Sequence, residues 1–490
     1  MIDPRVAIGC FLAGGLALFL RMPPRKAVTA CILLASMFLP VRGGWDLPLL
    51  PPIDKNTAGV LTAFLGCLWM GRRQLLAASP GRGLDLWILV LAVGAIGTTL
   101  TNHEPIYARI HVPGLGLRDI LSMVVRDLLA YGLPFFMGKA LIRTPEALRD
   151  LLRAFVWAGI VYSLLALVEM RLSPQMHLWI YGFHANRFIT AYRLGGFRPM
   201  LFMESGIALG GFMLTTVLAA VALRRSGQTL VHPVVTRFVP PYLFVILILC
   251  RSLGSIVYGL ILVPVQWLLR PEAILRVAAV LAVIVCVYPA ARLLGAGPTH
   301  ALLEAAATVN TRRAASLEHR FKTEDKLTGR ASEKLLLGWG GFNRALIDEE
   351  DGSRIREVDG FWILRLGQRG VVGLVGALAL LLGPIWVAFR RRRQLPQGMA
   401  PMLVACVALC VAARAVDMLP NGEYGPWPFY LSGALYGVVT RLRRRSVPDD
   451  GSETGPQNPP SGSGRGLGPE TQPAVPPSGR FADLLGRGPR

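Results

Sequence analysis

Long continuous apolar segments recur along most of the 490-residue chain, and they constrain the fold more than any other feature. Many are long enough to cross about 30 Å of hydrocarbon. Because lipid offers the backbone no hydrogen-bond partners, such segments must be helices or the strands of a closed barrel. Their apolar residues are continuous rather than alternating, which favours helices. Since only 17% of the residues are charged, against about a quarter in soluble proteins, we predict an all-α polytopic membrane protein.

Thirteen segments are predicted to span the membrane, and since the short ones are easily divided wrongly, we expect about 12–14 transmembrane helices. The segments are residues 6–20, 27–41, 58–70, 84–100, 120–138, 152–169, 200–223, 239–250, 253–269, 274–291, 361–389, 400–416 and 427–440. The chain divides into transmembrane helices with short loops (1–291), one large polar loop (292–358), further transmembrane helices (359–445) and a tail (446–490). The tail is rich in Pro, Gly and Ser, a composition typical of disorder.

Lys and Arg gather in alternate short connections, which indicates the orientation of the helices. Two to four of them lie in each of the connections at 21–26, 71–83, 139–153, 224–237, 270–276 and 390–393. We therefore expect these connections and the tail on the cytoplasmic side. The net charge of +22 is then mainly a topology signal, and no nucleic-acid partner is predicted.

Two connections on the opposite side also carry arginines: residues 170–199 and the loop at 292–358. In the first, Arg193 and Arg198 flank the pair Gly195-Gly196. An arginine binds phosphate through a planar fork of donors, and glycines let the backbone approach an anion closely. The alternative is that these side chains snorkel to the membrane interface.

Two further charged residues lie beside or within apolar segments. Arg251 stands alone between two of them, where it marks a tight turn or a broken helix and is either a headgroup anchor or a phosphate ligand. Glu204 is expected one turn inside the helix that follows Arg198. An ionised carboxylate there needs a partner or a polar cavity, so Glu204 is either a general base or the ion-pair partner of Arg198.

The large loop contains a charged stretch with helical spacing. Arg312, Ser316 and His319 are spaced i, i+4, i+7, and so are Arg313, Leu317 and Arg320. On a helix each set forms a stripe, so one flank would present arginines and a histidine to a diphosphate. A solvated amphipathic helix explains the same pattern.

Two residues near the end of the loop are also candidates. Trp339 lies in the turn-forming sequence Gly338-Trp339-Gly340-Gly341 and either stacks on a sugar ring or sits at the membrane interface. Asp359 stands where the loop meets the next helix, so it is either an N-cap or a general base. The seven cysteines lie in or beside apolar segments, without the spacing of a zinc site or a disulfide framework.

The order of these segments resembles the O-antigen ligase and polymerase superfamily of bacterial inner-membrane glycosyltransferases. Its members show an Arg-Xaa-Gly-Gly or Gly-Thr-Phe type segment before a helix, a Ser-Arg-Gly-like turn, a large periplasmic loop with an arginine and a Gly-Xaa-Gly segment, and then His-Asn, nine residues and Gly-Xaa-Xaa-Gly. The matching stretches here are residues 193–199, 250–255, 319–320 with 338–342, and Asp359-Gly360 followed by nine residues and Gly370-Val-Val-Gly373.

This resemblance implies a multi-pass protein of the bacterial inner membrane, similar to membrane glycosyltransferases of the GT-C class, with a periplasmic large loop and a cytoplasmic tail. It implies a lipid-linked oligosaccharide donor on undecaprenyl diphosphate, no metal or other cofactor, and a glycan, lipid or protein acceptor. Other polysaccharide-export proteins are candidate partners, beside membrane lipids. The motif histidine of the ligases is replaced by Asp359, which favours a polysaccharide polymerase or a ligase-like transferase.

The resemblance also suggests roles for the candidate residues. Asp359 would be the catalytic base, assisted by His319, and Trp339 and Glu204 would contact the sugar or the acceptor. The residues expected to bind the diphosphate are Arg193, Arg198, Arg251 and Arg320. A transporter or flippase for lipid-linked sugars is the alternative, although it should show repeat symmetry, which the sequence lacks.

Overall fold

A computed structural model describes the chain except residues 108–110, 194, 231, 297–302, 305–306, 309–310, 342, 347–354, 356–358, 423–424 and 446–490. The predicted tail at 446–490 therefore lies outside the described residues, as do the side chains of Arg312, Arg313, Ser316, Leu317 and His319. The described helices and strands are α1 (Pro4–Arg21), α2 (Pro24–Phe38), α3 (Lys55–Met70), α4 (Arg72–Leu76), α5 (Leu86–Leu100), β1 (Ile106–Tyr107), β2 (His111–Val112), α6 (Leu117–Asp127), α7 (Leu133–Leu141), α8 (Pro145–Leu172), α9 (Met176–Tyr181), β3 (Tyr192–Arg193), β4 (Gly196–Phe197), α10 (Gly206–Arg225), α11 (Pro233–Leu249), α12 (Leu253–Leu268), α13 (Pro271–Leu293), α15 (Thr311–Glu333), α16 (Phe361–Arg390), α17 (Ala400–Asp417) and α18 (Trp427–Arg445). Each strand pair, β1–β2 and β3–β4, is a short antiparallel hairpin.

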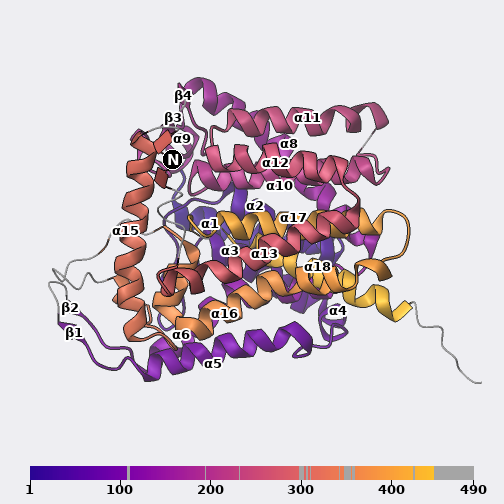
Figure 1. The fold of residues 1–490 in the computed structure, drawn as a ribbon. Coiled ribbons are helices and arrows are strands. Elements are labelled where there is room, and N and C mark those ends of the chain that lie inside the picture. Colours follow the sequence, from indigo (N-terminus) through magenta and orange to yellow (C-terminus); the bar gives the residue numbers. More distant parts are fainter. Residues whose placement is uncertain are drawn as a thin grey trace, which may run out of the picture. The chain divides into compact units, whose positions relative to one another are not determined.

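Most of the long helices lie side by side along one direction (Figure 1). Within the described residues, eight helical segments are long and apolar enough to cross a membrane: α1, Gly83–Leu100, Leu117–Leu141, α8, α10, α13, α16 and α17. The apolar helices α11 and α12 are shorter. These segments confirm an all-α, multi-pass membrane protein, whereas the expected 12–14 crossings stay a prediction.

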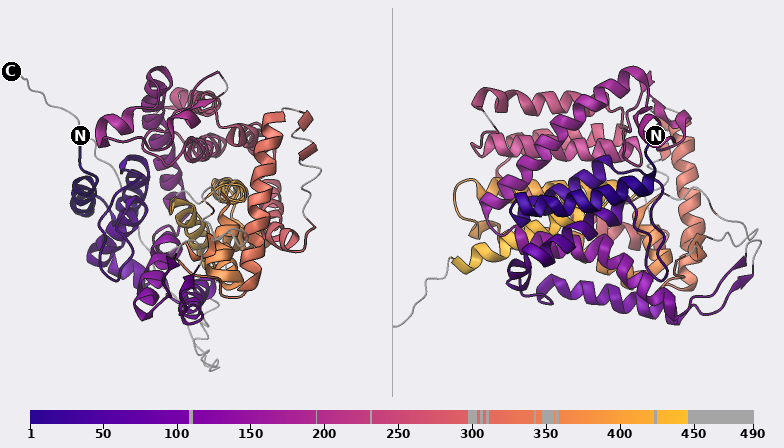
Figure 2. Two further views of the ribbon diagram at one scale, coloured as in Figure 1. Left: turned by 90° about the vertical axis from the view of Figure 1, so that its left-hand side faces the viewer. Right: turned by 180° about the vertical axis from the view of Figure 1, so that it is seen from behind.

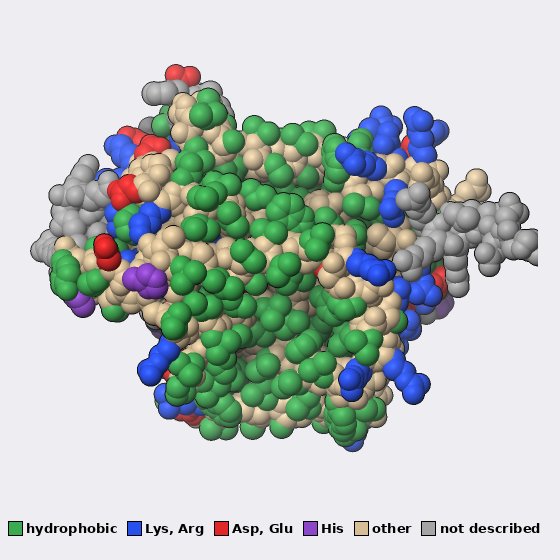
Figure 3. Space-filling model, turned by 90° about the horizontal axis from the view of Figure 1, so that it is seen from below, with side chains coloured by type: hydrophobic (Ala, Val, Ile, Leu, Met, Phe, Trp, Pro, Cys, Tyr) green, Lys and Arg blue, Asp and Glu red, His purple; other side chains and the backbone are tan. Residues whose placement is uncertain are grey.

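An apolar band covers the middle of the face seen in Figure 3. At one end of this band most charged side chains are Lys and Arg, and at the other they are mixed with acidic side chains and histidines (Figure 3). Such a distribution is typical of a protein whose basic end faces the cytoplasm. The N-terminus lies at the same end as α15 (Figures 1 and 2).

Helix α10 lies inside the bundle, packed against α8, α11, α12 and α17. In its most apolar 18-residue window 94% of the residues are buried, and a helix that is apolar all round is expected to be buried. The predicted segment began at residue 200, but the structure begins α10 at Gly206, with Ser205 as the N-cap whose side chain accepts a hydrogen bond from the Ala208 amide. Glu204 therefore lies before the helix and not one turn inside it.

Helix α15 crosses the ends of the other helices instead of running parallel to them (Figures 1 and 2). Arg292 holds it there, because its guanidinium pairs with Glu324 Oε2 at 3.2 Å and with Asp325 Oδ1 at 2.8 Å. Tyr288 donates a further hydrogen bond to Glu324 Oε2 at 3.1 Å. Arg292 was predicted to open the large loop, but α13 continues to Leu293, so this arginine belongs to a bundle helix.

Helix α16 occupies the predicted segment 361–389 but is broken at Gly370, whose φ of 63° and ψ of −168° are not helical. The segment before it in the chain fills the break. Val371 N–H donates to the Leu335 carbonyl at 2.8 Å, and Trp339 N–H donates to the Gly367 carbonyl at 2.8 Å. Backbone freed from a helix inside a membrane protein needs such partners, so the glycine-rich turn at 338–341 and the Gly370 motif form one unit.

Candidate functional site

Arg198 anchors the first part of the candidate site. It follows the β3–β4 hairpin and is only 6% exposed, and its Nη2 donates to Ser252 Oγ at 3.1 Å. A Cβ added to Gly206 would lie 2.2 Å from Arg198 Nε, so the arginine packs directly on the N-terminus of α10. Because the first turn of a helix leaves amide N–H groups unpaired, this end of α10 adds partial positive charge to that of Arg198.

Arg251 lies in the two-helix turn between α11 and α12, with a positive φ of 52°. This confirms the predicted tight turn. Its Nη1 donates to the Arg193 carbonyl at 3.1 Å, and a Cβ on Gly196 would lie 2.0 Å from that nitrogen. The Gly195-Gly196 pair therefore lets the hairpin lie against the Arg251 guanidinium, and Arg193 projects from the hairpin as an exposed side chain.

An ion pair at the end of α17, Arg414–Asp417, completes this part of the site and was not predicted from the sequence. Both side chains are buried, and Asn421 Nδ2 donates to Asp417 Oδ1 at 2.9 Å. Gly211 of α10 gives the guanidinium room, because an added Cβ would lie 2.8 Å from Arg414 Nη1. The sequence signal was available, since two ionisable residues spaced i, i+3 in an apolar segment are expensive unless they are functional or paired.

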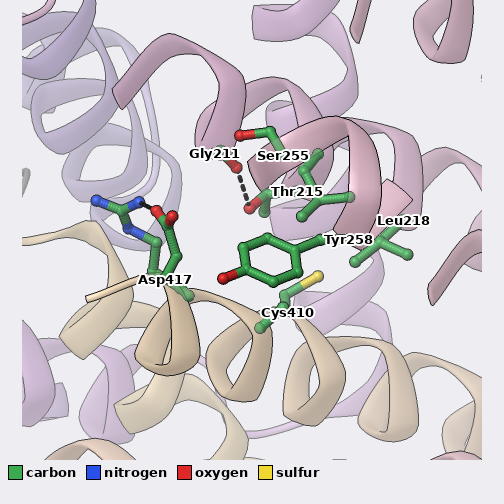
Figure 4. A pocket seen from close by; sticks show the side chains of 10 residues that line it. Gly211, Thr215, Leu218, Ser255, Tyr258, Cys410 and Asp417 are labelled. Atoms are coloured by element: carbon green, nitrogen blue, oxygen red, sulfur yellow. Dashed lines mark hydrogen bonds and ion pairs between the residues drawn. The ribbon is translucent and has the colours of Figure 1, made fainter. Parts of the chain in front are cut away.

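A pocket opens beside this ion pair, between α10, α12 and α17 (Figure 4). Its cavity volume is about 10 Å³, which is room for about one water molecule. Its walls are polar near Asp417, Ser255 and Tyr258 and become apolar towards Leu218 (Figure 4). The pocket therefore joins a charged end to an apolar interior.

Arg320 and Asp359, which lie 39 positions apart in the chain, form an ion pair in the structure. Arg320 Nη2 lies 3.1 Å from Asp359 Oδ2, and Arg320 Nη1 donates to the Pro420 carbonyl at 3.3 Å. Asp359 is not the N-cap of α16, because Gly360 occupies that position and the Phe361 amide donates to the Met418 and Asn421 carbonyls. The carboxylate is thus left to face Arg320.

These two parts of the site are neighbours. Arg320 donates to the Pro420 carbonyl at 3.3 Å, and the next residue, Asn421, donates to Asp417 at 2.9 Å. Helix α10 contacts Arg198 at Gly206 and Arg414 at Gly211. The structure therefore brings together five of the eight residues predicted from the sequence, which are Arg193, Arg198, Arg251, Arg320 and Asp359. His319 precedes Arg320 in α15, but its side chain lies outside the described residues.

Glu204 and Trp339 lie in other surroundings. Glu204 Oε1 is 4.0 Å from Nζ of the buried Lys55, which also donates to the Phe202 carbonyl. The Trp339 ring is covered by Arg330, whose Cζ lies 3.4 Å from the ring centroid, and by Lys334 at 4.5 Å. Burial, together with the nearby charges of Arg344 and Arg330, lowers the pKa of Lys334. The side chains of Arg330 and Lys334 thus lie over the Trp339 ring in this structure, and the sugar contact of Trp339 stays a prediction.

A second charged cluster, also missed from the sequence, lies within the bundle beside the break in α16. Asp127 of α6 pairs with Arg365 Nη1 at 2.8 Å and with Arg369 Nε at 3.2 Å. All three residues are at most 5% exposed, and Arg365 also lies over the Tyr131 ring at 4.6 Å. The i, i+4 spacing of the two arginines was the available signal.

The comparisons with known proteins do not place the chain in a family. No protein-family model matches it, and no curated protein matches it either. The chemistry of the site therefore rests on its own geometry. Five arginines and two carboxylates gather at one end of the bundle, an arrangement suited to binding a multiply charged anion.

Proposed function

We propose that the protein is a metal-independent membrane glycosyltransferase that moves glycan from an undecaprenyl-diphosphate carrier to an acceptor. The reaction would take place at the bundle end that bears α15, which would be the periplasmic face of a bacterial inner membrane. The observation that carries this proposal is the meeting of arginines from separate segments: Arg198 after the β3–β4 hairpin, Arg251 in the α11–α12 turn, Arg320 in α15 and Arg414 in α17.

The excess of arginines over carboxylates in this cluster supports a diphosphate ligand. The positive-inside rule does not explain arginines at the end opposite the main basic clusters, so they need another role. Guanidinium groups bind phosphate oxygens in pairs of hydrogen bonds. Fixed cations in a site that excludes water stabilise the charge that develops on a leaving diphosphate. The pocket between α10, α12 and α17 adds apolar walls next to these cations.

The proposed reaction is one displacement at the anomeric carbon of the donor sugar. An acceptor hydroxyl oxygen forms the new bond to that carbon, and the bond from the carbon to the diphosphate oxygen breaks. The diphosphate leaves with the bonding electron pair, held by the arginines, and Asp359 accepts the hydroxyl proton as general base. His319 would assist this proton transfer, and Glu204 and Trp339 would contact the acceptor or the sugar.

Glycan transfer to purified protein in lipid nanodiscs, given a lipid-linked repeat unit, would test the proposal. A polymerase yields a ladder of longer carrier-linked chains, whereas a ligase adds glycan once to a different acceptor. We expect Arg198→Gln and Asp359→Asn each to lower the transfer rate at least about a hundredfold, since removing a charge-stabilising group or a general base typically costs that much. Arg118→Gln is the matched control, because Arg118 is an exposed cation at the start of α6, at the same bundle end.

A transporter or flippase for lipid-linked sugars is the second candidate, and the break in α16 favours it. Discontinuous helices and charges inside the bundle, here Asp127, Arg365 and Arg369, are features of transporters. The same nanodisc assay separates the two functions when it is paired with proteoliposomes. If glycan crosses the bilayer unchanged in length and Asp359→Asn has no effect, the transferase proposal is wrong.

A further inference from the structure

The site holds two arginine–aspartate pairs that differ sharply in exposure. In the Arg320–Asp359 pair the side chains are 35% and 53% exposed. In the Arg414–Asp417 pair they are 2% and 5% exposed, and Asn421 donates to Asp417 as well. An arginine–aspartate ion pair is therefore present once at the surface of the cluster and once in its interior.

This difference decides which pair an incoming anion can open. Water and salt already compete for an exposed ion pair, so its net contribution is small. Separating a buried pair leaves one charge in a poorly solvated place, which is strongly unfavourable. A diphosphate carries more negative charge and more acceptor oxygens than one carboxylate. It can take Arg320 from Asp359, whereas the Arg414–Asp417 pair stays closed.

We infer that binding of the diphosphate and release of Asp359 are a single exchange at Arg320, an inference that rests on the proposed function. Before the donor binds, the Asp359 carboxylate is engaged by the Arg320 guanidinium, with Nη2 3.1 Å from Oδ2, and it is not available to an acceptor hydroxyl. When the diphosphate takes Arg320, the carboxylate of Asp359 becomes available to the acceptor hydroxyl. Arg320 thus pairs first with Asp359 and then with the diphosphate, and Asp359 is released only when the diphosphate leaving group is in place.

The exchange can be tested by binding alone, without glycan transfer. The probe is inorganic pyrophosphate, titrated calorimetrically into the full chain in nanodiscs at low salt. Asp359→Asn removes the competing carboxylate and should tighten binding about two- to fivefold. Arg320→Gln removes a charged ligand and should weaken binding about tenfold. In the Arg320→Gln background, Asp359→Asn should change the affinity less than about 1.5-fold, because the carboxylate then competes for no guanidinium, and such non-additive effects mark residues that interact.

A matched carboxylate separates this exchange from a general loss of negative charge. Glu318 lies on α15, two residues before Arg320, and its side chain is 51% exposed and pairs with Lys322 at 2.8 Å. Glu318→Gln should therefore leave pyrophosphate affinity within 1.5-fold. If Glu318→Gln tightens binding as much as Asp359→Asn, or if Asp359→Asn still tightens it without Arg320, the exchange is refuted.

The outcome is independent of the transferase assay. Glycan transfer together with additive effects of the two substitutions would refute the exchange and leave the proposed function standing. Coupled effects on pyrophosphate without glycan transfer would support the exchange at an anion site and refute the transferase. Unchanged thermal unfolding of each variant in nanodiscs shows that the comparison concerns folded protein.

Discussion

The break in α16 yields a prediction whose magnitude follows from the structure. Gly370 has φ 63° and ψ −168°, a region that only glycine occupies readily, and another residue there costs about 1–3 kcal/mol. In Gly370→Ala the added Cβ would lie 2.2 Å from the Leu336 carbonyl oxygen, so the segment at 335–337 must move away. That movement breaks the hydrogen bonds from Val371 and Val372 to Leu335 and Leu336.

The two effects together give the expected destabilisation. A backbone hydrogen bond contributes about 1 kcal/mol net, so the two bonds and about 2 kcal/mol of strain sum to about 4 kcal/mol. Reversible unfolding in mixed micelles measures the free energy of unfolding. Hydrogen exchange at the Trp339 and Gly340 amides, which donate to Gly367 and Gln368, reports the local displacement.

Gly227→Ala provides the control for backbone strain alone. Gly227 also has a positive φ, 69°, but a Cβ there would meet nothing within 4 Å. We expect a loss of about 1 kcal/mol, so the difference between the two variants isolates the contact with Leu336. Equal losses in both variants, with the amides of 339–340 still protected, would refute the proposed interlocking of the loop and α16.

Three further predictions concern single contacts. Asp417→Ala removes the carboxylate from the buried Arg414 and should lower the free energy of unfolding by about 3–5 kcal/mol. The double variant Arg414→Met/Asp417→Leu removes both charges and should lose less. A larger loss in the double variant would contradict this reasoning. Burial lowers the pKa of His177, whose Nε2 accepts from the Val41 amide at 3.2 Å. The unfolded chain then binds more protons, so stability should fall as pH drops below about 6.5, and melting curves should lose this dependence in His177→Gln. Trp339→Ala should cost about 1–2 kcal/mol through the lost cation–π contact with Arg330, and Trp339→Phe clearly less, by the same unfolding measurement.

The sequence predicted the helices well because their signal is local. A continuous apolar segment must be helical in lipid whatever its neighbours are, and α16, α17 and α12 follow the predicted ranges closely. Errors arose where a helix end depends on a distant partner. Arg292 was assigned to the loop because it is charged, yet its pairing with Glu324 and Asp325 makes it a stable end of α13.

The site could be predicted only in part, for the same reason. The glycine pair beside a helix start drew attention to Arg198, and a lone charge between two apolar segments drew attention to Arg251; both lie in the cluster. Spacing along the chain does not reveal that α15 folds back to place Arg320 on Asp359. Arg414 and Asp417 were missed because the apolar segment that contains them predicts only a membrane-spanning helix. Its packing against α10, which buries the two side chains, cannot be predicted from the segment alone.

Helix α10 has a consequence for the time course of events at the site. Three of its glycines, Gly206, Gly210 and Gly211, carry the contacts of Arg198, Ser252 and Arg414, and the helix is enclosed by its neighbours. These groups are therefore expected to keep a fixed geometry while exposed side chains such as Arg193 change rotamer within picoseconds to nanoseconds. Any step in the microsecond to millisecond range must then come from a larger displacement. Helix α15 crosses the bundle ends and is held there by ion pairs and by the buried side chains of Phe321, Leu327 and Ala331. It is the segment in which relaxation-dispersion measurements should detect such a displacement.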